Sequence, residues 1–170
     1  ERLPVPLRGR AGACFRQAAH PESGFNPQLI DYLVRPSGLS GLREEIDLVM
    51  SRAVLEHVND LQATFHDMYA ALKPGGTAIH LVDLKSHGLH RENPLDFLCW
   101  PNWLWSLMYG AKGVPNRLRV NAYRNAVAQS GLELISMNPT VLASPDDVRA
   151  VRQRLAAPFR NLADEDLSWL

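Results

Sequence analysis

Apolar positions change their spacing twice between residues 46 and 84, and each change predicts a different element. Ile46–Met50 is almost continuously apolar, which is typical of a buried strand in a parallel sheet. Thr77–Leu84 has the same character and predicts a second buried strand. Between them, four apolar residues recur at spacings of four, three and four, which places them on one face of a helix: Leu61, Phe65, Met68 and Leu72.

Both ends of this predicted helix carry residues that start or stop helices. Asn59 or Asp60 can cap its start, because a short oxygen-bearing side chain accepts hydrogen bonds from free backbone amides. Lys73 suits the negative end of the helix dipole, and Pro74–Gly76 prevents the helix from continuing. Strand, helix and strand over residues 46–84 therefore predict a βαβ unit with a right-handed crossover.

The segments around this unit differ in regularity. Residues 1–28 are rich in proline and glycine and predict an irregular N-terminal arm, whereas residues 29–170 form the predicted domain. Within the domain, Leu29–Val34 predicts a strand. Residues 85–116 interrupt the α/β order and predict a helical insertion, with a helix around Pro94–Tyr109.

Regular α/β order resumes after the insertion. Asn116 can cap a helix that Gly131 ends, and Leu132–Met137 predicts the next strand. Ser144 starts another helix, because a capping serine precedes proline at the first helical position and acids in the first turn. A last short helix is predicted over Ala163–Leu170.

Composition and charge mainly exclude classes of function. Eighteen basic and eighteen acidic residues cancel, and no long run of either sign favours a nucleic-acid partner or an anionic membrane. The apolar stretches are too short to span a bilayer, and no signal peptide is evident. Cys14 and Cys99 match no metal spacing or disulfide framework, so we expect free thiols and a cytoplasmic location. Three neighbouring arginines predict a solvated helix face: Arg117, Arg119 and Arg124.

Two segments of the βαβ unit, SRAVLEHV and DMYAALKPGG, carry a family resemblance. They resemble the fourth strand, the following helix and the fifth-strand entry of class I S-adenosylmethionine-dependent methyltransferases, and within these the type 11 group. The resemblance covers about residues 29–138 and is specific over 46–84. It implies an α/β fold, with a Rossmann-like, mostly parallel sheet and flanking helices. It also implies methyl transfer to a small-molecule or saccharide acceptor, which we expect at oxygen.

The same resemblance implies which residues contact S-adenosylmethionine. In the family, the residues just past the fourth strand line the methionine and adenosine portions of the cofactor. The matching positions in this sequence are Met50, Ser51, Arg52 and Ala53, followed by Glu56 and His57. Glu56 and His57 have an alternative role, since they can simply fix the turn into the helix.

The sequence departs from the family pattern where the cofactor is normally held. None of the eleven glycines forms the acid-bearing loop E/D-x-G-x-G-x-G, and Arg35–Gly38 lacks the acid that often contacts adenine. The ribose-binding acid and the seventh, antiparallel strand have no counterpart either. We therefore expect a sheet truncated at both ends, without the N-terminal glycine-loop unit and the last strand. The alternative to an enzyme is a non-catalytic module that packs on a partner and binds no cofactor.

Candidate catalytic residues follow the second predicted strand. His87 is a candidate general base for an acceptor hydroxyl, with Asp83 and His90 as comparable candidates, because this loop leaves the carboxyl end of a strand. Asp83 can instead bind backbone amides of its own loop. His87, His90 and Glu92 form an H-x-x-H-x-E string, but no regular spacing aims them at one ion, so we expect no metal there. His80 lies within an apolar strand and is expected to be a core histidine.

The insertion is rich in aromatic residues, and two interpretations stay open. Their spacing permits ordinary packing against the sheet, or a lid that excludes water and shapes an acceptor pocket. The candidate acceptor contacts are Trp100, Trp103 and Tyr109. A truncated sheet also exposes an edge and an apolar face, so we expect pairing with a second copy of the chain.

Overall fold

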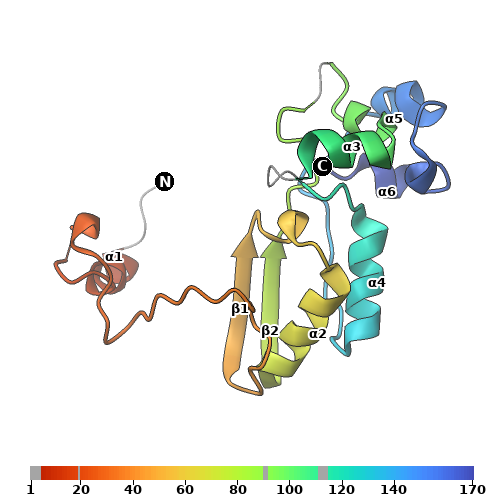
Figure 1. Cartoon of the computed structure of the whole chain (residues 1–170). Coiled ribbons are helices and arrows are strands. Elements are labelled where there is room, and N and C mark those ends of the chain that lie inside the picture. The colour runs from red at the N-terminus through yellow and green to blue at the C-terminus, as the bar shows by residue number, and fades with distance from the viewer. Residues whose placement is uncertain (1–4, 19, 90–91, 111–114) are drawn as a thin grey trace. The chain divides into compact units, whose positions relative to one another are not determined.

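The predicted βαβ unit is present in the structure (Figure 1). In this computed structural model, which describes residues 5–18, 20–89, 92–110 and 115–170, β1 spans Ile46–Arg52 and β2 spans Leu72–Leu81. The two strands pair in parallel, with Leu48 opposite Thr77 and Arg52 opposite Leu81. The structure thus confirms a mixed α/β fold with a small parallel sheet.

The helix between the strands, α2, spans Leu61–Ala71. The carboxylate of Asp60 accepts a hydrogen bond from the backbone N–H of Ala63 at 2.9 Å, which confirms the predicted cap. The predicted role of Lys73 is wrong, because it lies in β2 and its Nζ contacts both carboxylate oxygens of Asp47 at 2.9 Å. The Pro-Gly-Gly stretch therefore belongs to an irregular start of β2.

Helix α2 covers one face of the sheet and packs along α4, which spans Val120–Ser130. Gly131 ends α4 in the left-handed conformation, at φ 96°, and a Cβ at this position would lie 3.0 Å from the ring of Tyr69. The predicted cap at Asn116 is wrong, because α4 begins four residues later at Val120. The core between these elements contains Leu61, Phe65, Met68, Leu72, Val120, Tyr123, Ala126 and Val127.

Two predicted strands are wrong. Leu29–Val34 and Leu132–Met137 have no regular structure, and Val34 and Ile135 are 81% and 83% exposed. An isolated strand leaves its backbone donors and acceptors unpaired, so an apolar run forms one only where a neighbouring strand is present. Among the described residues, only β1 and β2 form a sheet.

The structure divides into two compact units, Glu1–Gly38 and Leu39–Leu170. In the first, the segment predicted to be irregular contains α1, Val5–Ala13, and a 3-10 turn at Pro21–Ser23. The rings of Phe15 and Phe25 stack with centroids 6.0 Å apart, beside an antiparallel bridge between the same residues.

A second core fills the C-terminal part of the larger unit. Pro101 separates a 3-10 turn at Asp96–Cys99 from α3, Asn102–Tyr109, so the insertion helix starts later than predicted. Helix α5, Pro145–Arg152, starts with a capping box in which Ser144 and Asp147 bond each other's backbone amides, and α6 spans Asp164–Ser168. These elements bury Leu95, Phe97, Leu98, Trp105, Val148, Val151, Leu155, Phe159 and Leu167.

The prediction of a solvated arginine face is wrong for two of its three residues. Arg119 is 2% exposed, and its guanidinium donates to the carbonyl oxygens of Leu84, Leu167 and Trp169. Arg117 is 5% exposed and stacks on the ring of Trp105 at 4.6 Å. Both side chains thus join segments of the larger unit.

Candidate functional site

The carboxyl ends of β1 and β2 lie at one edge of the sheet, because the strands are parallel and adjacent. The loop after β1 turns sharply at Ala53, which has a φ of 53°, while its N–H donates to the carbonyl of Leu81 at 2.8 Å. The loop after β2 contains Asp83 and His87. This edge is where open parallel sheets bind ligands.

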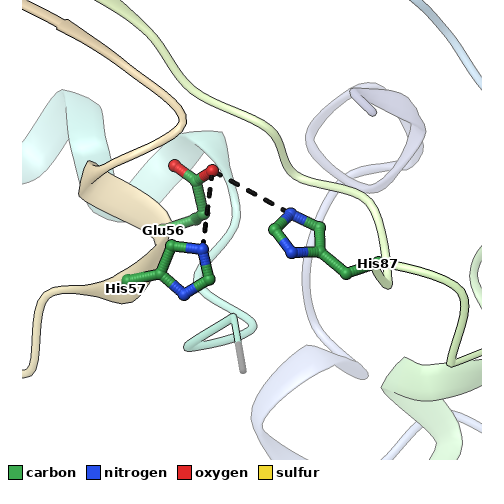
Figure 2. Close-up of side chains that lie close together, drawn as sticks. All are labelled: Glu56, His57 and His87. Atoms are coloured by element: carbon green, nitrogen blue, oxygen red, sulfur yellow. Dashed lines mark ion pairs between the residues drawn. The ribbon is translucent and has the colours of Figure 1, made fainter. Parts of the chain in front are cut away.

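Two histidines face one buried carboxylate at this edge (Figure 2). Nε2 of His57 lies 4.0 Å from Oε1 of Glu56, and Nε2 of His87 lies 3.9 Å from the same oxygen. The two imidazole rings approach edge to face, with centroids 5.2 Å apart. The candidate site therefore draws one imidazole from the loop after β2 and the other, with the carboxylate, from the loop after β1.

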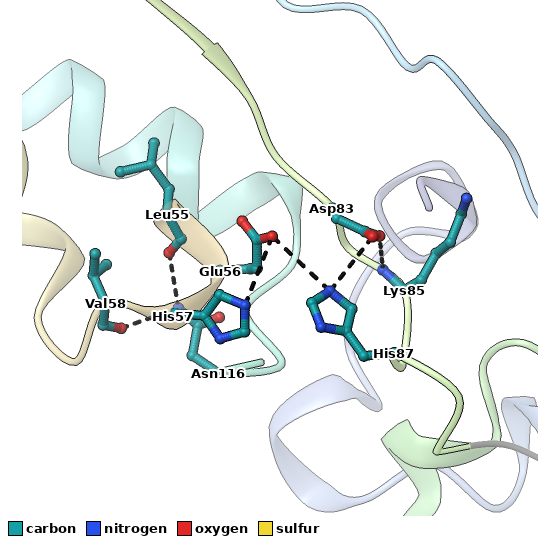
Figure 3. A network of polar contacts seen from close by, with 8 residues as sticks. All are labelled: Leu55, Glu56, His57, Val58, Asp83, Lys85, His87 and Asn116. Atoms are coloured by element: carbon teal, nitrogen blue, oxygen red, sulfur yellow. Dashed lines mark hydrogen bonds and ion pairs between the residues drawn. The ribbon is translucent and has the colours of Figure 1, made fainter. Parts of the chain in front are cut away.

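Asp83 extends this cluster on the far side of His87 (Figure 3). Its Oδ2 lies 3.4 Å from Nε2 of His87, while its Oδ1 accepts a hydrogen bond from the backbone N–H of Lys85 at 3.0 Å. The predicted bond to a backbone amide of its own loop is thus confirmed for Asp83, which also faces the imidazole of His87. A carboxylate beside an imidazole can orient the ring.

Asn116 holds the loop after β1 in place (Figure 3). Its side-chain amide donates to the carbonyls of Leu55 and Val58 at 3.2 and 3.1 Å. Its backbone N–H donates to the carbonyl of Glu56 at 2.7 Å. Asn116 is therefore a positioning residue, and the sequence analysis missed this role because the contacts span about sixty residues of chain.

Glu56 is the most deeply buried member of the cluster. Its side chain is 1% exposed, and neither carboxylate oxygen has a hydrogen-bond partner among the described residues. Nearby, burial raises the pKa of the Tyr123 hydroxyl above its usual range, and the charge of Glu56 adds to that shift. A buried carboxylate without hydrogen bonds is costly, which is why such groups concentrate at functional sites.

The residues expected to contact the cofactor lie on and just after β1, and they differ in exposure. Met50, Arg52 and Ala53 are exposed, with Met50 at 68%, whereas Ser51 is half-buried and bonds Nδ1 of His80 at 2.7 Å. Together with Glu56 and His57 they form a continuous segment at the cluster's edge of the sheet. They supply a surface, not an enclosed pocket.

His80 is half-buried beneath this edge and packs against the core residue Phe65. Its ring meets Phe65 edge to face at 6.1 Å, and burial lowers its pKa below the ordinary value of 6.5. The folded protein therefore favours neutral His80, while the unfolded chain binds a proton as the pH falls through 6.5. The stability that His80 contributes is complete above pH 6.5 and is lost progressively below it.

Replacing His80 with glutamine is expected to weaken this acid sensitivity. Urea unfolding at pH 7.5 and pH 5.0 would measure it, and the wild-type chain is expected to lose more stability between the two values than His80→Gln. All other titrating groups are common to both proteins, so they cancel in the comparison. Equal losses of stability in the wild type and in His80→Gln would contradict the assignment of this acid sensitivity to His80.

The aromatic candidates do not share one environment. Trp103 on α3 is 68% exposed, whereas Trp100 and Tyr109 are half-buried against the second core, and the Tyr109 ring lies 4.7 Å from that of Trp105. Packing therefore accounts for Trp100 and Tyr109, and Trp103 is left open to solvent. His90 lies outside the described residues.

A hollow of about 460 Å³ lies away from the cluster, lined by residues of Arg43–Glu44, Tyr69–Gly76 and Gly131–Glu133. It adjoins the start of β2, the opposite end of the strand from Asp83 and His87. It contains no cluster of imidazoles or orphaned carboxylates. The hollow and the cluster of histidines and carboxylates thus lie at different places, and the cluster is the better candidate site.

Comparison with known proteins adds a family to this geometry. A family model described as a methyltransferase domain matches residues 6–137, which is most of the chain. No curated protein and no solved structure matches the chain. Among the residues described, no helix is both long and apolar enough to cross a membrane.

Proposed function

We propose, because the chain belongs to the class I S-adenosylmethionine-dependent methyltransferase-like family, that it transfers a methyl group from S-adenosylmethionine to a hydroxyl of a small molecule or saccharide. The observation that carries the proposal is the cluster at the carboxyl ends of β1 and β2. There, Asp83 and His87 from one loop meet Glu56 and His57 from the other.

The residues at the end of β1 fit one side of such a cofactor. Met50 offers an exposed apolar surface suited to the adenosine and methionine portions, and Ser51–Ala53, where the strand ends, lies beside it. The carboxylates of Glu56 and Asp83 lie at the same edge of the sheet, and negative charge there attracts a sulfonium cation. These residues form one wall of a cofactor site.

The bound cofactor would supply an activated methyl group, so that the sulfur–carbon bond breaks as the oxygen–carbon bond forms, leaving a neutral thioether and one proton to remove. The Asp83–His87 pair is placed to take that proton from the acceptor hydroxyl. The rest of the protein's task is to hold the hydroxyl in line with the methyl group.

Trp103 supports an acceptor with an apolar or saccharide face. It is 68% exposed on α3, in the segment that follows β2, and an exposed indole can pack on a ring of the acceptor. Trp100 and Tyr109, packed against the second core, would set the position of α3.

A non-catalytic, partner-binding module is the second candidate, and the exposed face of the sheet favours it. Leu48, Met50, Ile79 and Leu81 are between 43% and 68% exposed. Apolar side chains grouped in this way are typical of an interaction surface, including one that pairs two copies of the chain.

Calorimetry with S-adenosylhomocysteine is expected to show binding in the micromolar range, because the product retains the adenosine and thioether portions that the β1 turn would contact. Met50→Asp is expected to weaken binding, since it places a charge on the apolar surface. Gln62→Ala on α2, away from the turn, is the matched control. The absence of a binding signal at millimolar S-adenosylhomocysteine would contradict the methyltransferase proposal and favour the partner-binding module.

A further inference from the structure

We infer that Glu56, His57 and His87 bind a divalent transition-metal cation of the Zn²⁺ class. One carboxylate oxygen and two imidazole nitrogens converge, and all three donor atoms lie within 4.8 Å of one another. Carboxylate and imidazole are ligands that zinc sites use, and three protein ligands leave a position open. The sequence analysis considered a metal only at His87, His90 and Glu92, which are neighbours along the chain, and expected none there.

The spacing of the donors suits a cation between them. Ligand bonds of about 2.1 Å in a tetrahedral site place neighbouring donor atoms about 3.4 Å apart. The two measured nitrogen–oxygen distances, 4.0 Å for His57 and 3.9 Å for His87, exceed that value by about half an ångström. Both exceed a hydrogen bond, so the imidazoles do not satisfy Glu56 directly. A small rotation of the two partly exposed rings closes the gap around an ion.

The burial and hydrogen bonding of Glu56 are an independent observation that supports a bound cation. Its side chain is 1% exposed, and both carboxylate oxygens lack hydrogen-bond partners within the part of the chain that the structure describes. The hydrogen bonds of the two buried arginines go elsewhere, since Arg117 donates to the carbonyls of Phe97 and Trp100 while Arg119 donates to three other carbonyls. A buried carboxylate without hydrogen bonds is costly, and a bound cation would offset that cost.

The surrounding contacts hold the ligands as metal sites require. Asn116 fixes the backbone of the loop that carries Glu56 and His57 through three hydrogen bonds. Asp83, whose Oδ2 lies 3.4 Å from Nε2 of His87, lies beside the proposed site without belonging to the three-residue set.

The cation would also give the site a way to acidify the acceptor, and this step alone rests on the proposed function. An acceptor hydroxyl at the open position would lose its proton more readily, as water does on zinc. Since His87 would then be a ligand, Asp83 is the member of the Asp83–His87 pair that would take the proton.

Titration of the full chain with Zn²⁺, against a chromophoric chelator, tests the inference. We expect one ion per chain, and at least about 100-fold weaker binding in Glu56→Gln and in His87→Ala. His66→Ala is the matched control, because His66 is exposed on α2 outside the cluster, and it is expected to bind as the wild type does. Co²⁺ provides a second measurement, since its visible spectrum reports nitrogen and oxygen ligands. If Glu56→Gln proves unstable on heating, His57→Gln replaces it.

The wild type failing to bind Zn²⁺, or both ligand variants binding it as tightly as the wild type does, would overturn the inference. S-adenosylhomocysteine affinity, measured on the same samples with and without Zn²⁺, separates it from the proposed function. Zn²⁺ binding without S-adenosylhomocysteine binding would support the metal site and contradict the methyltransferase proposal. The reverse result would leave the methyltransferase proposal standing and refute the metal site.

Discussion

Replacing Arg119 with methionine is expected to lower the free energy of unfolding by about 3–6 kcal/mol. The guanidinium donates to the carbonyls of Leu84, Leu167 and Trp169, and methionine fills a similar volume without a donor. Each buried carbonyl left without a partner costs about 1–3 kcal/mol. Domains are stable by only about 5–15 kcal/mol, so the variant would keep little stability.

The positive charge of Arg119 contributes to the expected loss of stability. Burial lowers the pKa of its guanidinium to about 10, with Tyr123 and Asp166 opposing that shift, so the side chain stays protonated at neutral pH. The three carbonyls thus solvate a buried cation and tie the end of β2 to the C-terminal segment. Urea unfolding of the full chain at pH 7.5 would measure the loss.

Arg149 provides the matched control for this measurement. It is 69% exposed and pairs with Asp146, which is 86% exposed, so Arg149→Met is expected to cost less than about 1 kcal/mol. A loss of similar size in both variants would show that burial and the carbonyl contacts of Arg119 do not matter. The sequence placed Arg119 in a solvated group, so the result also tests that correction.

The βαβ unit could be predicted because local signals agreed at every step. The apolar run at Ile46–Met50, the stripe on α2 and the cap at Asp60 each predict an element by themselves. The runs at Leu29–Val34 and Leu132–Met137 also had strand composition. They failed because a strand depends on a partner elsewhere, and composition does not reveal whether the partner is present.

The candidate site was predicted in parts but not as a whole. Glu56 and His57 were named as cofactor contacts, and Asp83 and His87 as catalytic candidates, so the two pairs were assigned to different tasks. Adjacent parallel strands end at one edge, and that rule alone would have placed the four side chains together. The burial of Glu56 could not be foreseen, because it depends on Asn116 and on packing far along the chain.

Replacing His87 with alanine is expected to reduce turnover by about 10²–10⁴-fold while leaving S-adenosylhomocysteine affinity unchanged. His87 faces Asp83 at 3.4 Å and Glu56 at 3.9 Å, so its loss disrupts both the Asp83–His87 pair and the proposed metal site. The cofactor contacts on β1 would stay in place. Transfer of a labelled methyl group from S-adenosylmethionine to a panel of hydroxyl-bearing saccharides and phenols would measure turnover.

Asp83→Asn distinguishes the two roles that His87→Ala removes together. The asparagine oxygen can still accept the hydrogen bond from the N–H of Lys85, so the loop is expected to keep its shape. If Asp83 is the proton acceptor beside a metal-ligated His87, Asp83→Asn loses turnover but keeps Zn²⁺ affinity. His66→Ala is again expected to match the wild type in both measurements. Full turnover in both Asp83→Asn and His87→Ala would contradict a proton-transfer role for this pair, and the loop after β2 would then serve only to shape the site.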